Sequence, residues 1–579
     1  MITRKQLVLF CGVIFLLALA VRLLTWQDNA RDIWKVQTSV VEGYRDSARQ
    51  LATGDFKTFV SDINHFGHPP GYPILLAAIF KTAGESTTAI HIVQILCDVL
   101  AVVVLFLIAL ELFSVAVAVI AALLAAISPQ FAYFSVLLLP DSLVVLPILL
   151  AVYFVIRARR SPRVSYFLIA GALIGVSCWF RANALLLPLF LAVAAALLVE
   201  RDKRRRAAAA ALIAGAVLAI APITIKNAIV YRAFVPLSLG AGQTLLEGIA
   251  EYDKANHFNI PNTDLGLMRQ EAAWYGNPEY AQLLFGRDGV ERDRGRVARG
   301  FAVIRSHPVW FAGVMARRGL DSNRLEPVPV LASESPVSHD LADGPVVWTS
   351  TGWGRFSGDA SKYGTQRSSD VIDVLTGADY VFHVPLKLEQ GRVQVTITDA
   401  AGENVLAWQG VDLVEGVSAE NQPLRNLAIP FVTGNTSGVR LNVANFASPN
   451  LVVTVGPIQL VELGPSSYQW LRYVRIPLGW VQRTFKTAVF VPLVVIGLIL
   501  LLRKREWRTV AIILAVPAYY VIVQSALHTE RRYVYVIHFF YLLAAAVTLC
   551  SLFNLLRNAK TRYAKRQVHI PQDPTLSAE

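Results

Sequence analysis

The chain has 579 residues, 54% of them hydrophobic, and its mean hydropathy is +0.47. These values are typical of a polytopic membrane protein with one sizeable soluble part. The formal net charge is +13, but the basic residues are dispersed over short segments between apolar stretches, so nucleic acid is excluded from the expected partners.

Ten apolar stretches are candidate membrane spans, for which roughly 17–25 residues are usual. In chain order they cover residues 6–24, 89–110, 114–128, 142–156, 166–180, 184–199, 207–223, 487–502, 509–526 and 534–556. A shorter apolar stretch at 74–80 is predicted to be a helix that lies along the membrane interface. The sequence therefore predicts a polytopic α-helical membrane protein with about ten transmembrane helices.

Five basic clusters give the expected orientation. When ten spans are counted, all five fall on one side of the membrane, at residues 4–5, 157–163, 201–206, 503–508 and 557–566. By the positive-inside rule that side is the cytoplasm. Both termini, including a tail at 561–579, are then cytoplasmic, and the long loops are external.

The first external loop carries two short patterns. Tyr44, Ala48 and Leu51 recur at helical spacing, and Gly54 follows where such a helix would end. The run His-Pro-Pro-Gly-Tyr-Pro then occupies residues 68–73. Because a polar, carboxylate-bearing loop is costly to place between membrane helices, a functional site is the default hypothesis for this loop.

The hydrophobic period changes to two in the longest external segment. From about Pro345 to Leu463, apolar and polar residues alternate in short runs separated by Gly, Asn and Asp. This pattern predicts an external all-β sandwich, jelly-roll-like, over residues 340–465. The sandwich is inserted between a membrane core at 1–325 and the last three spans at 470–560.

Aromatic side chains of the predicted sandwich could stack on sugar rings. The candidates are Trp348, Trp353, Phe356, Tyr363 and Trp408. Most of them could instead be core residues or surface anchors, and we favour that interpretation. Sandwich folds carry many functions, so the fold alone does not decide between the two.

The two first-loop patterns resemble the first external loop of the polyprenyl-phosphate-sugar glycosyltransferases. These are the GT-C membrane enzymes typified by protein O-mannosyltransferases and by the aminoarabinose transferase of lipid A. Segments 226–238 and 530–533 are similar to the basic-Asn, Phe-Val-Pro-Leu-Ser and Glu-x-Arg-Tyr motifs of that family. The resemblance covers residues 1–320 and 470–560 and leaves the sandwich outside. It implies an enzyme of the bacterial cytoplasmic (inner) membrane with a periplasmic active site.

Sugar transfer from a lipid phosphate needs a carboxylate that accepts the acceptor's proton or orients the acceptor. The catalytic candidates are Glu42, Asp46 and Asp141. In the family an acidic residue precedes the position of Tyr44, usually a little farther upstream than Glu42. We rank Glu42 first and Asp46 second. Alternatively, Glu42 caps a loop helix, Asp46 faces solvent, and Asp141 is an ordinary helix N-terminal residue favoured by the helix dipole.

Cationic groups must bind the donor phosphate and stabilise it as it leaves. Basic residues at external helix ends run against the positive-inside bias, which makes four of them candidates: Arg181, Lys226, Arg531 and Arg532. Snorkelling toward lipid head groups is the alternative explanation. Four first-loop residues are predicted to position substrate, namely Tyr44, His65, His68 and Tyr72.

The leading hypothesis is an inverting glycosyltransferase that moves a hexose or pentose from a polyprenyl-phosphate donor to an external protein, lipid or glycan. Its expected partners are that donor, that acceptor and the lipid bilayer. No cofactor is expected, because no Asp-rich or His-rich cluster argues for a metal, and a divalent metal is left open. The alternatives are an inactive paralogue and an envelope carbohydrate-binding protein. A transporter is disfavoured because the spans are nearly free of charge.

Overall fold

The computed structural model describes residues 3–29, 38–61, 67–160, 163–198, 202–286, 288–331, 345–414, 417–465 and 469–567. The chain divides into two compact units. The first comprises Met1–Thr25, Asp32–Pro329 and Gln482–Glu579, and the second comprises Trp26–Arg31 and Val330–Val481. Because the second unit interrupts the first, the helical unit is assembled from segments far apart in the sequence.

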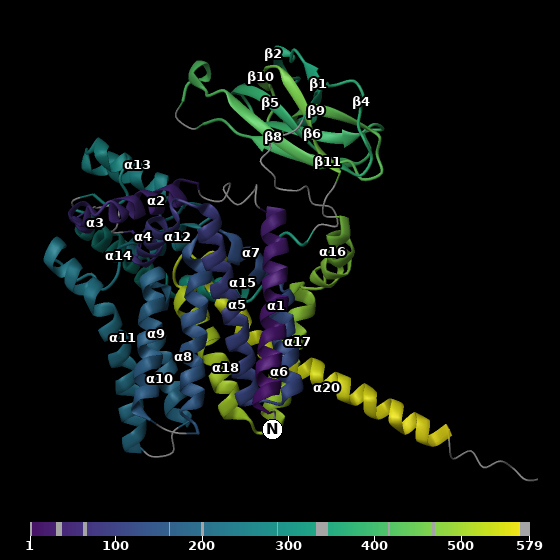
Figure 1. Ribbon diagram of the computed structural model, residues 1–579. Coiled ribbons are helices and arrows are strands. Elements are labelled where there is room, and N and C mark those ends of the chain that lie inside the picture. The colour runs from purple at the N-terminus through teal and green to yellow at the C-terminus, as the bar shows by residue number, and fades with distance from the viewer. Residues whose placement is uncertain are drawn as a thin grey trace, which may run out of the picture. The chain divides into compact units, whose positions relative to one another are not determined.

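The first unit is helical (Figure 1). Its helices before the interruption are α1 (Arg4–Asn29), α2 (Thr38–Ala52), α3 (Phe56–Ser61), α4 (Gly71–Ala83), α5 (Thr87–Leu112), α6 (Val115–Ile127), α7 (Pro129–Val136), α8 (Val145–Arg157), α9 (Val164–Phe180), α10 (Leu187–Leu198), α11 (Asp202–Tyr231), α12 (Ala241–Ala250), α13 (Asp264–Tyr275), α14 (Gly289–Ser306) and α15 (Pro308–Ser322). After it come α17 (Thr487–Arg503), α18 (Trp507–Tyr519), α19 (Arg531–Val534) and α20 (Val536–Gln567). Short 3₁₀ turns lie between these helices at η3 (Pro140–Val144), η4 (Ala182–Ala184) and η5 (Pro278–Ala281). A π turn, Tyr520–Gln524, directly follows α18.

Six helices of the described residues are long and apolar enough to cross a membrane, and the number rises to eight if each of two bent helix pairs is one span. The helices Val164–Phe180 and Ala182–Leu197 are apolar but shorter. Each of the ten stretches expected from the sequence lies on one of these apolar helices. A multi-span helical membrane protein is thus confirmed, and the number ten stays a prediction. The expected interfacial helix at 74–80 corresponds to α4.

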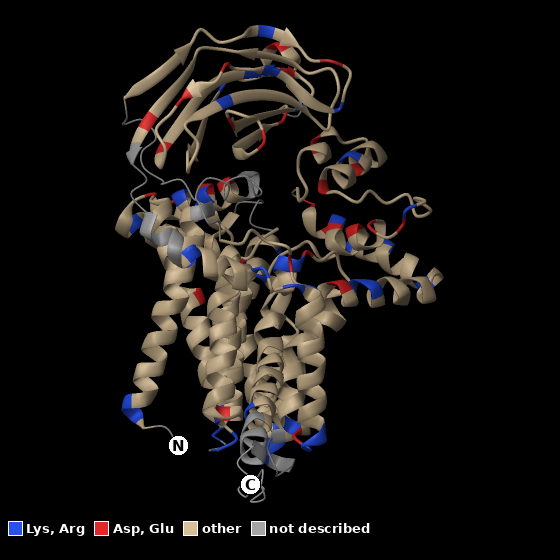
Figure 2. Ribbon diagram, turned by 90° about the vertical axis from the view of Figure 1, so that its right-hand side faces the viewer, with Lys and Arg blue, Asp and Glu red and all other residues tan. Residues whose placement is uncertain are grey.

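Most charged residues of the helical unit lie beyond the two ends of its bundle, and the middle of the bundle is almost free of them (Figure 2). Helices α2, α3, α12, α13 and α14 gather at one end, opposite the end where α1 begins (Figure 1). This separation is expected for a bundle whose middle is surrounded by hydrocarbon, where charged side chains are costly.

Helices α9 and α11 cross at close range because glycines line their contact. A Cβ atom at Gly171 would lie 1.8 Å from the carbonyl oxygen of Leu212, and one at Gly215 would lie 2.1 Å from that of Leu168. Small residues let helix backbones approach in this way inside a bilayer. The crossing fixes α9, whose last residue directly precedes Arg181.

A buried ion pair joins α1, α5 and α6 inside the bundle. Arg22 Nε donates to Asp98 Oδ2 at 2.8 Å, and Arg22 Nη2 donates to the carbonyl oxygen of Ala125 at 3.2 Å. Both charged side chains are completely buried. An unpaired charge at this depth would be expensive, and the pairing removes most of that cost.

The second unit consists of antiparallel β-sheets (Figure 1). Its strands are β1 (Val346–Ser350), β2 (Gly354–Ser357), β3 (Tyr363–Ser368), β4 (Ile372–Asp373), β5 (Ala378–Gln390), β6 (Val393–Asp399), β7 (Val405–Val411), β8 (Arg425–Val432), β9 (Gly438–Phe446), β10 (Val452–Val455) and β11 (Ile458–Pro465), and α16 (Gln469–Gln482) follows them. One sheet has the order β1-β11-β5-β10-β2 with β8 also paired to β5, and the other has the order β3-β9-β6-β7 with β4 paired to β9.

The two sheets share one hydrophobic core. Phe382 and Val384 of β5 enter it from the first sheet, and Val395 of β6 and Leu441 of β9 enter it from the second. Their neighbours along each strand point to the opposite face, as the period of two requires. Two antiparallel sheets over a common core confirm the expected all-β region, and a jelly-roll-like strand order stays a prediction.

Candidate functional site

Asp141 and Arg181 form an ion pair near one end of the helical bundle. Arg181 Nη2 donates to Asp141 Oδ2 at 2.8 Å, and both side chains are largely buried. Asp141 follows Pro140 in the 3₁₀ turn η3, which leads into α8, and Arg181 lies in extended backbone directly after α9. Arg181 Nε, also buried, has no hydrogen-bond partner in the described part of the chain. The pair therefore keeps donor capacity for another anionic group.

The segment before α20 adds a second guanidinium. Arg181 lies over the ring of Tyr533 at 4.4 Å from its centroid, and Arg532 approaches the same ring at 5.1 Å. Arg532 Nε is 2.7 Å from Glu530 Oε2. Arg181 and Arg532 thus contact one aromatic ring, and each is also paired with a carboxylate. Such an arrangement can bind a phosphate, and the carboxylates balance the positive charge when no phosphate is bound.

A small pocket of about 10 Å³, partly open to solvent, lies at this arrangement. It is lined by Asp141, Val144, Val145, Arg181, Asn183, Tyr520, Arg532, Tyr533, Tyr535 and Val536. These residues come from η3, α8, the α9–α10 connection, the π turn, α19 and α20. Charged groups and apolar side chains thus meet in one small space.

Asn183 forms hydrogen bonds that link the segments lining the pocket. Its Nδ2 donates to the carbonyl oxygen of Tyr533 at 2.8 Å. Its own carbonyl oxygen accepts hydrogen bonds from Tyr519 Oη at 2.6 Å and from Gln524 Nε2 at 3.0 Å. The α9–α10 connection that carries Arg181 is in this way bound to the segment that carries Arg532.

The first loop packs behind the pocket. The buried ring of Tyr44 meets that of Tyr72 edge-on at 5.1 Å and that of His68 at 5.2 Å. Tyr72 Oη donates to Gln94 Oε1 at 3.2 Å. Gln94 Nε2 in turn donates to the carbonyl oxygen of Leu139, two residues before Asp141, at 3.0 Å. The expected helix over residues 44–51 is present as α2, and it contacts the site through Tyr44.

The electrostatic environment keeps the cations charged. Burial opposes the charge of Arg181, but Asp141 and the neighbouring groups keep the pKa of Arg181 above its ordinary value. The pKa of Arg532 is also raised, although burial opposes it. Burial raises the pKa of Tyr44 to about 12, while the nearby Arg181 lowers it and Asp141 raises it by smaller amounts. Tyr44 is therefore a neutral hydrogen-bonding and packing group at physiological pH.

Residues 67–225 match the family described as dolichyl-phosphate-mannose-protein mannosyltransferase. This segment contains both members of the Asp141–Arg181 pair. This match confirms the resemblance to the polyprenyl-phosphate-sugar glycosyltransferases over residues 67–225, and the apolar helices described above make the chain a multi-pass membrane protein.

Two solved structures are similar to the chain. One is the archaeal oligosaccharyltransferase AglB from Archaeoglobus fulgidus in complex with an inhibitory peptide and a dolichol-phosphate, at 14% identity and a TM-score of 0.43 over 97% of this chain and 52% of that one. The other is the Archaeoglobus fulgidus oligosaccharyltransferase in complex with zinc and sulfate, at 18% identity and a TM-score of 0.32 over 54% and 42%. The chain thus spans about half the length of the first. No curated protein sequence matches it.

Two carboxylates that were ranked highest from the family pattern lie outside the pocket. Glu42 and Asp46 are on α2 with side chains 48% and 65% exposed. Glu42 lies 3.5 Å from Arg45, and Asp46 accepts a hydrogen bond from Arg49 at 2.7 Å. Both carboxylates therefore belong to a surface ion-pair cluster, and Asp141 is the candidate carboxylate that the structure brings together with the candidate cations.

The remaining candidates are dispersed. Lys226 on α11 lies over the ring of Tyr231 at 4.8 Å and does not line the pocket. Arg531 points to Asp321, which lies at 3.1 Å. His68 and Tyr72 lie in the wall behind Tyr44, and His65 is outside the described residues.

Sequence reasoning missed several lining residues, among them Asn183, Tyr520, Tyr533 and Tyr535. Tyr533 is the last residue of the segment 530–533, and Asn183 lies two residues after Arg181, so proximity to these candidates was a usable signal for both. Tyr520 and Tyr535 lie inside apolar stretches and carried no such signal. In the described part of the chain, no group of three or more His, Cys, Asp or Glu residues could hold a metal ion.

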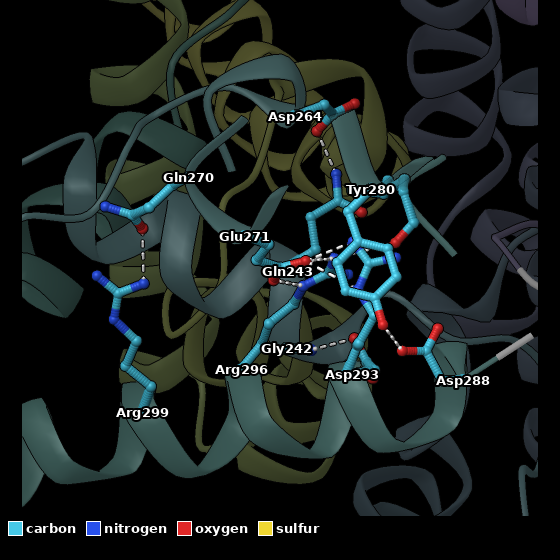
Figure 3. Close-up of polar contacts among 12 residues, drawn as sticks. Gly242, Gln243, Asp264, Gln270, Glu271, Tyr280, Asp288, Asp293, Arg296 and Arg299 are labelled. Carbon is cyan, nitrogen blue, oxygen red and sulfur yellow. Dashed lines mark hydrogen bonds and ion pairs between the residues drawn. The ribbon is translucent and has the colours of Figure 1, made fainter. Parts of the chain in front are cut away.

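A second cluster of charged residues lies among α12, α13 and α14 (Figure 3). Glu271 accepts hydrogen bonds from Arg296 Nε at 2.6 Å and from Arg292 Nε at 3.0 Å. Burial, followed by the neighbouring Asp264, raises the pKa of Glu247 to about 9. Since each buried carboxylate here contacts partners from other helices of the same group, we interpret the cluster as the polar core that orders this part of the long loop.

Proposed function

We propose that the chain is an inverting glycosyltransferase that moves a sugar from a polyprenyl-phosphate donor to an acceptor on the external face of the membrane. The observation that carries this proposal is the convergence of Asp141, Arg181 and Arg532 on one pocket of the helical unit. The family match over residues 67–225 supplies the chemical class, since the family is described by a lipid-phosphate-linked mannose donor.

Arg181 and Arg532 bind the donor phosphate in this proposal. Both guanidiniums line the pocket, and neither can lose its charge at physiological pH. As the anomeric carbon–oxygen bond breaks, negative charge grows on the departing lipid phosphate, and fixed cations stabilise that charge in the transition state. Arg181 Nε is available for this contact without breaking the bond to Asp141.

Asp141 acts on the acceptor. A hydroxyl oxygen of the acceptor attacks the anomeric carbon as the bond to the phosphate oxygen breaks, and the hydroxyl proton passes to the Asp141 carboxylate. The lipid phosphate leaves with the electron pair of the broken bond. A single displacement of this kind inverts the anomeric configuration. The pairing with Arg181 positions Asp141 in the pocket, whereas the carboxylates of Glu42 and Asp46 are paired on the surface of α2.

Mass spectrometry of cells with and without the gene tests the proposal. Cells lacking the protein should accumulate a polyprenyl-phosphate sugar and lose one glycosylated envelope product. Wild-type protein should restore that product, and an Asp141→Asn variant expressed at the same level should not. Polyprenyl-phosphate-mannose is the first donor to measure, because the family description names a mannose donor.

Unchanged envelope glycans and lipid-linked sugars in the deletion strain would overturn the assignment as an active transferase and would favour an inactive paralogue. Full restoration by Asp141→Asn would leave a transferase in place but move the acceptor-activating group to another residue.

A further inference from the structure

The β unit carries an exposed aromatic surface on the outer face of the β3-β9-β6-β7 sheet. Of the five aromatic residues noted in the sequence, Phe356 is in the core and Trp348 and Trp353 pack against it. Trp408 on β7 is 54% exposed, and Tyr363 on β3 is 64% exposed. Core packing therefore explains three of the five side chains and leaves these two unexplained.

Phe446 on β9 joins the two exposed rings into one surface. Its ring centroid is 6.1 Å from that of Tyr363 and 6.4 Å from that of Trp408. The indole of Trp408 lies close to Gly410, two residues later: a Cβ atom at Gly410 would be in ordinary van der Waals contact with Trp408 Cζ3, at 3.8 Å. The indole thus leans along the sheet above a glycine, with its other side exposed.

Uncharged polar side chains lie beside these rings. Trp408 is directly opposite Thr396 on β6, Thr396 is opposite Asn442 on β9, and Asn442 is opposite Ser368 on β3. An indole, two hydroxyls and an amide thus form one row across four strands. The guanidinium at the end of the aromatic surface, Arg392, is paired with Asp412. Arg440 on β9, opposite Thr398, donates to the carbonyl oxygens of Ala400 and Ser369. The face therefore combines apolar rings, uncharged polar groups and one guanidinium bound to backbone.

We propose that this face binds an uncharged glycan chain, whose pyranose rings stack on Trp408 and Tyr363 while their hydroxyls bond to the row at Thr396 and Asn442. A pyranose ring has one apolar face made of C–H groups and a rim of hydroxyls, which matches an exposed ring beside amides and hydroxyls. The row is already held together by its own hydrogen bonds, such as Ser368 Oγ to Asn442 Oδ1 at 2.7 Å, and its remaining donor and acceptor capacity is available to sugar hydroxyls but of no use to a purely apolar partner. An acidic chain would pair with Arg440 instead, and the acidic probe below tests for that outcome. This binding site is separate from the proposed catalytic pocket and does not depend on it.

Oxidative footprinting of the full-length protein in lipid nanodiscs tests the proposal. Mannohexaose and cellohexaose are the neutral probes, and an oligogalacturonate is the acidic one. A neutral probe should protect Trp408 and Tyr363 from oxidation. Trp408→Ala should weaken its binding about tenfold, the order expected when one ring contact and its buried area are lost. Trp408→Phe should retain most of the affinity, because a ring remains.

Trp480 supplies the matched control. It is 69% exposed on α16 and outside the sheet, so Trp480→Ala should bind the neutral probe as the wild type does. Asp141→Asn should also bind normally, which separates this site from the transferase reaction. The proposal would be overturned if neither neutral probe protected the two rings. It would also be overturned if the acidic probe bound better, or if Trp408→Ala bound a neutral probe as tightly as the wild type.

Discussion

At the scale of single residues, the site depends on which face of a helix a carboxylate occupies. Successive residues of an α-helix are rotated by about 100°, so a residue two positions from another lies about 200° around the axis. Tyr44 is buried against Tyr72, whereas Glu42 and Asp46 are each two residues away and exposed. Asp141 is the buried alternative, since it contacts Arg181 in the pocket.

Asp141→Asn should therefore lower turnover by about 10²–10⁴-fold, the usual contribution of a general base, because the amide cannot accept the proton. Glu42→Gln and Asp46→Asn serve as matched controls and should stay within a few-fold of the wild type. Initial rates with a labelled polyprenyl-phosphate sugar in proteoliposomes measure all three. If Glu42→Gln were inactive and Asp141→Asn active, Glu42 on α2 would be the general base instead.

The adjacent arginines of α19 provide a second comparison. Arg532 lines the pocket, whereas Arg531 pairs with Asp321 outside it. Arg532→Ala should reduce use of the donor by roughly ten- to a hundredfold, because one charge-assisted contact contributes about 1.5–3 kcal/mol. Arg531→Ala should mainly affect thermal stability. The dependence of rate on donor concentration distinguishes the two, and equal activity of the variants would place the phosphate elsewhere.

The raised pKa of Glu247 predicts that the stability of the folded protein depends on pH. Its pKa is raised in the folded protein to about 9, mainly by burial, so folding favours the protonated carboxyl. The resulting stabilisation is complete at acidic pH and is lost as the pH rises through the interval between the ordinary pKa and about 9. Over this pH interval, the Glu247→Gln variant should lose at least about 1 kcal/mol less of its free energy of unfolding than the wild type does. Thermal unfolding from about pH 5 to about pH 9 measures it. Glu291→Gln, an exposed carboxylate on α14, should leave the profile unchanged.

At the scale of elements, glycine decides how closely the helices that carry the site can approach. Gly171→Ala should destabilise the protein by about 1–3 kcal/mol or more, because its Cβ would overlap the backbone of α11. Gly12→Ala on α1 is the matched control, since a Cβ there meets nothing within 4 Å. Thermal denaturation in detergent measures both. A Gly171→Ala variant as stable as Gly12→Ala would mean that α9 and α11 separate easily.

Elements with a strong local period were predictable from the sequence. The spacing of Tyr44, Ala48 and Leu51 predicted α2, and the alternation near Val395 and Leu441 predicted the strands. The site was predictable only in part. Arg532 lies in a recognisable motif, and Arg181 and Asp141 stand at expected helix ends. Their convergence depends on how helices far apart in the sequence pack, which periodicity does not encode. For the same reason, nothing in the sequence paired Arg22 with Asp98.

At the scale of the whole molecule, all the strands of the second unit come from one continuous stretch of the chain, between Val330 and Val481. The first strand, β1, pairs with the last, β11, and Val346 lies opposite Val461. The start and the end of the β region are therefore adjacent, and its core is complete within its own strands. Such an arrangement is expected of a domain that is inserted into another and folds by itself.

Residues 345–465, expressed alone, should consequently give a soluble β protein with a cooperative thermal transition. About 120 residues are enough for an independent hydrophobic core. Circular dichroism at increasing temperature measures this. Val384→Asp, which places a charge in the shared core, should abolish the transition, whereas Trp408→Ala should preserve it. A fragment without β structure at room temperature would show that the unit needs the rest of the chain.

The Arg22–Asp98 pair has a consequence for biosynthesis. The two partners are 76 residues apart, so α1 is made and reaches the membrane before Asp98 leaves the ribosome. During that interval the nascent α1 contains an unneutralised guanidinium near the end of the expected span 6–24, where a charge costs less than the roughly 2.5–3.5 kcal/mol of a helix centre. The pair can form only after α5 has been synthesised, so we expect α1 to reach its final position in the bundle later than the order of translation alone would place it.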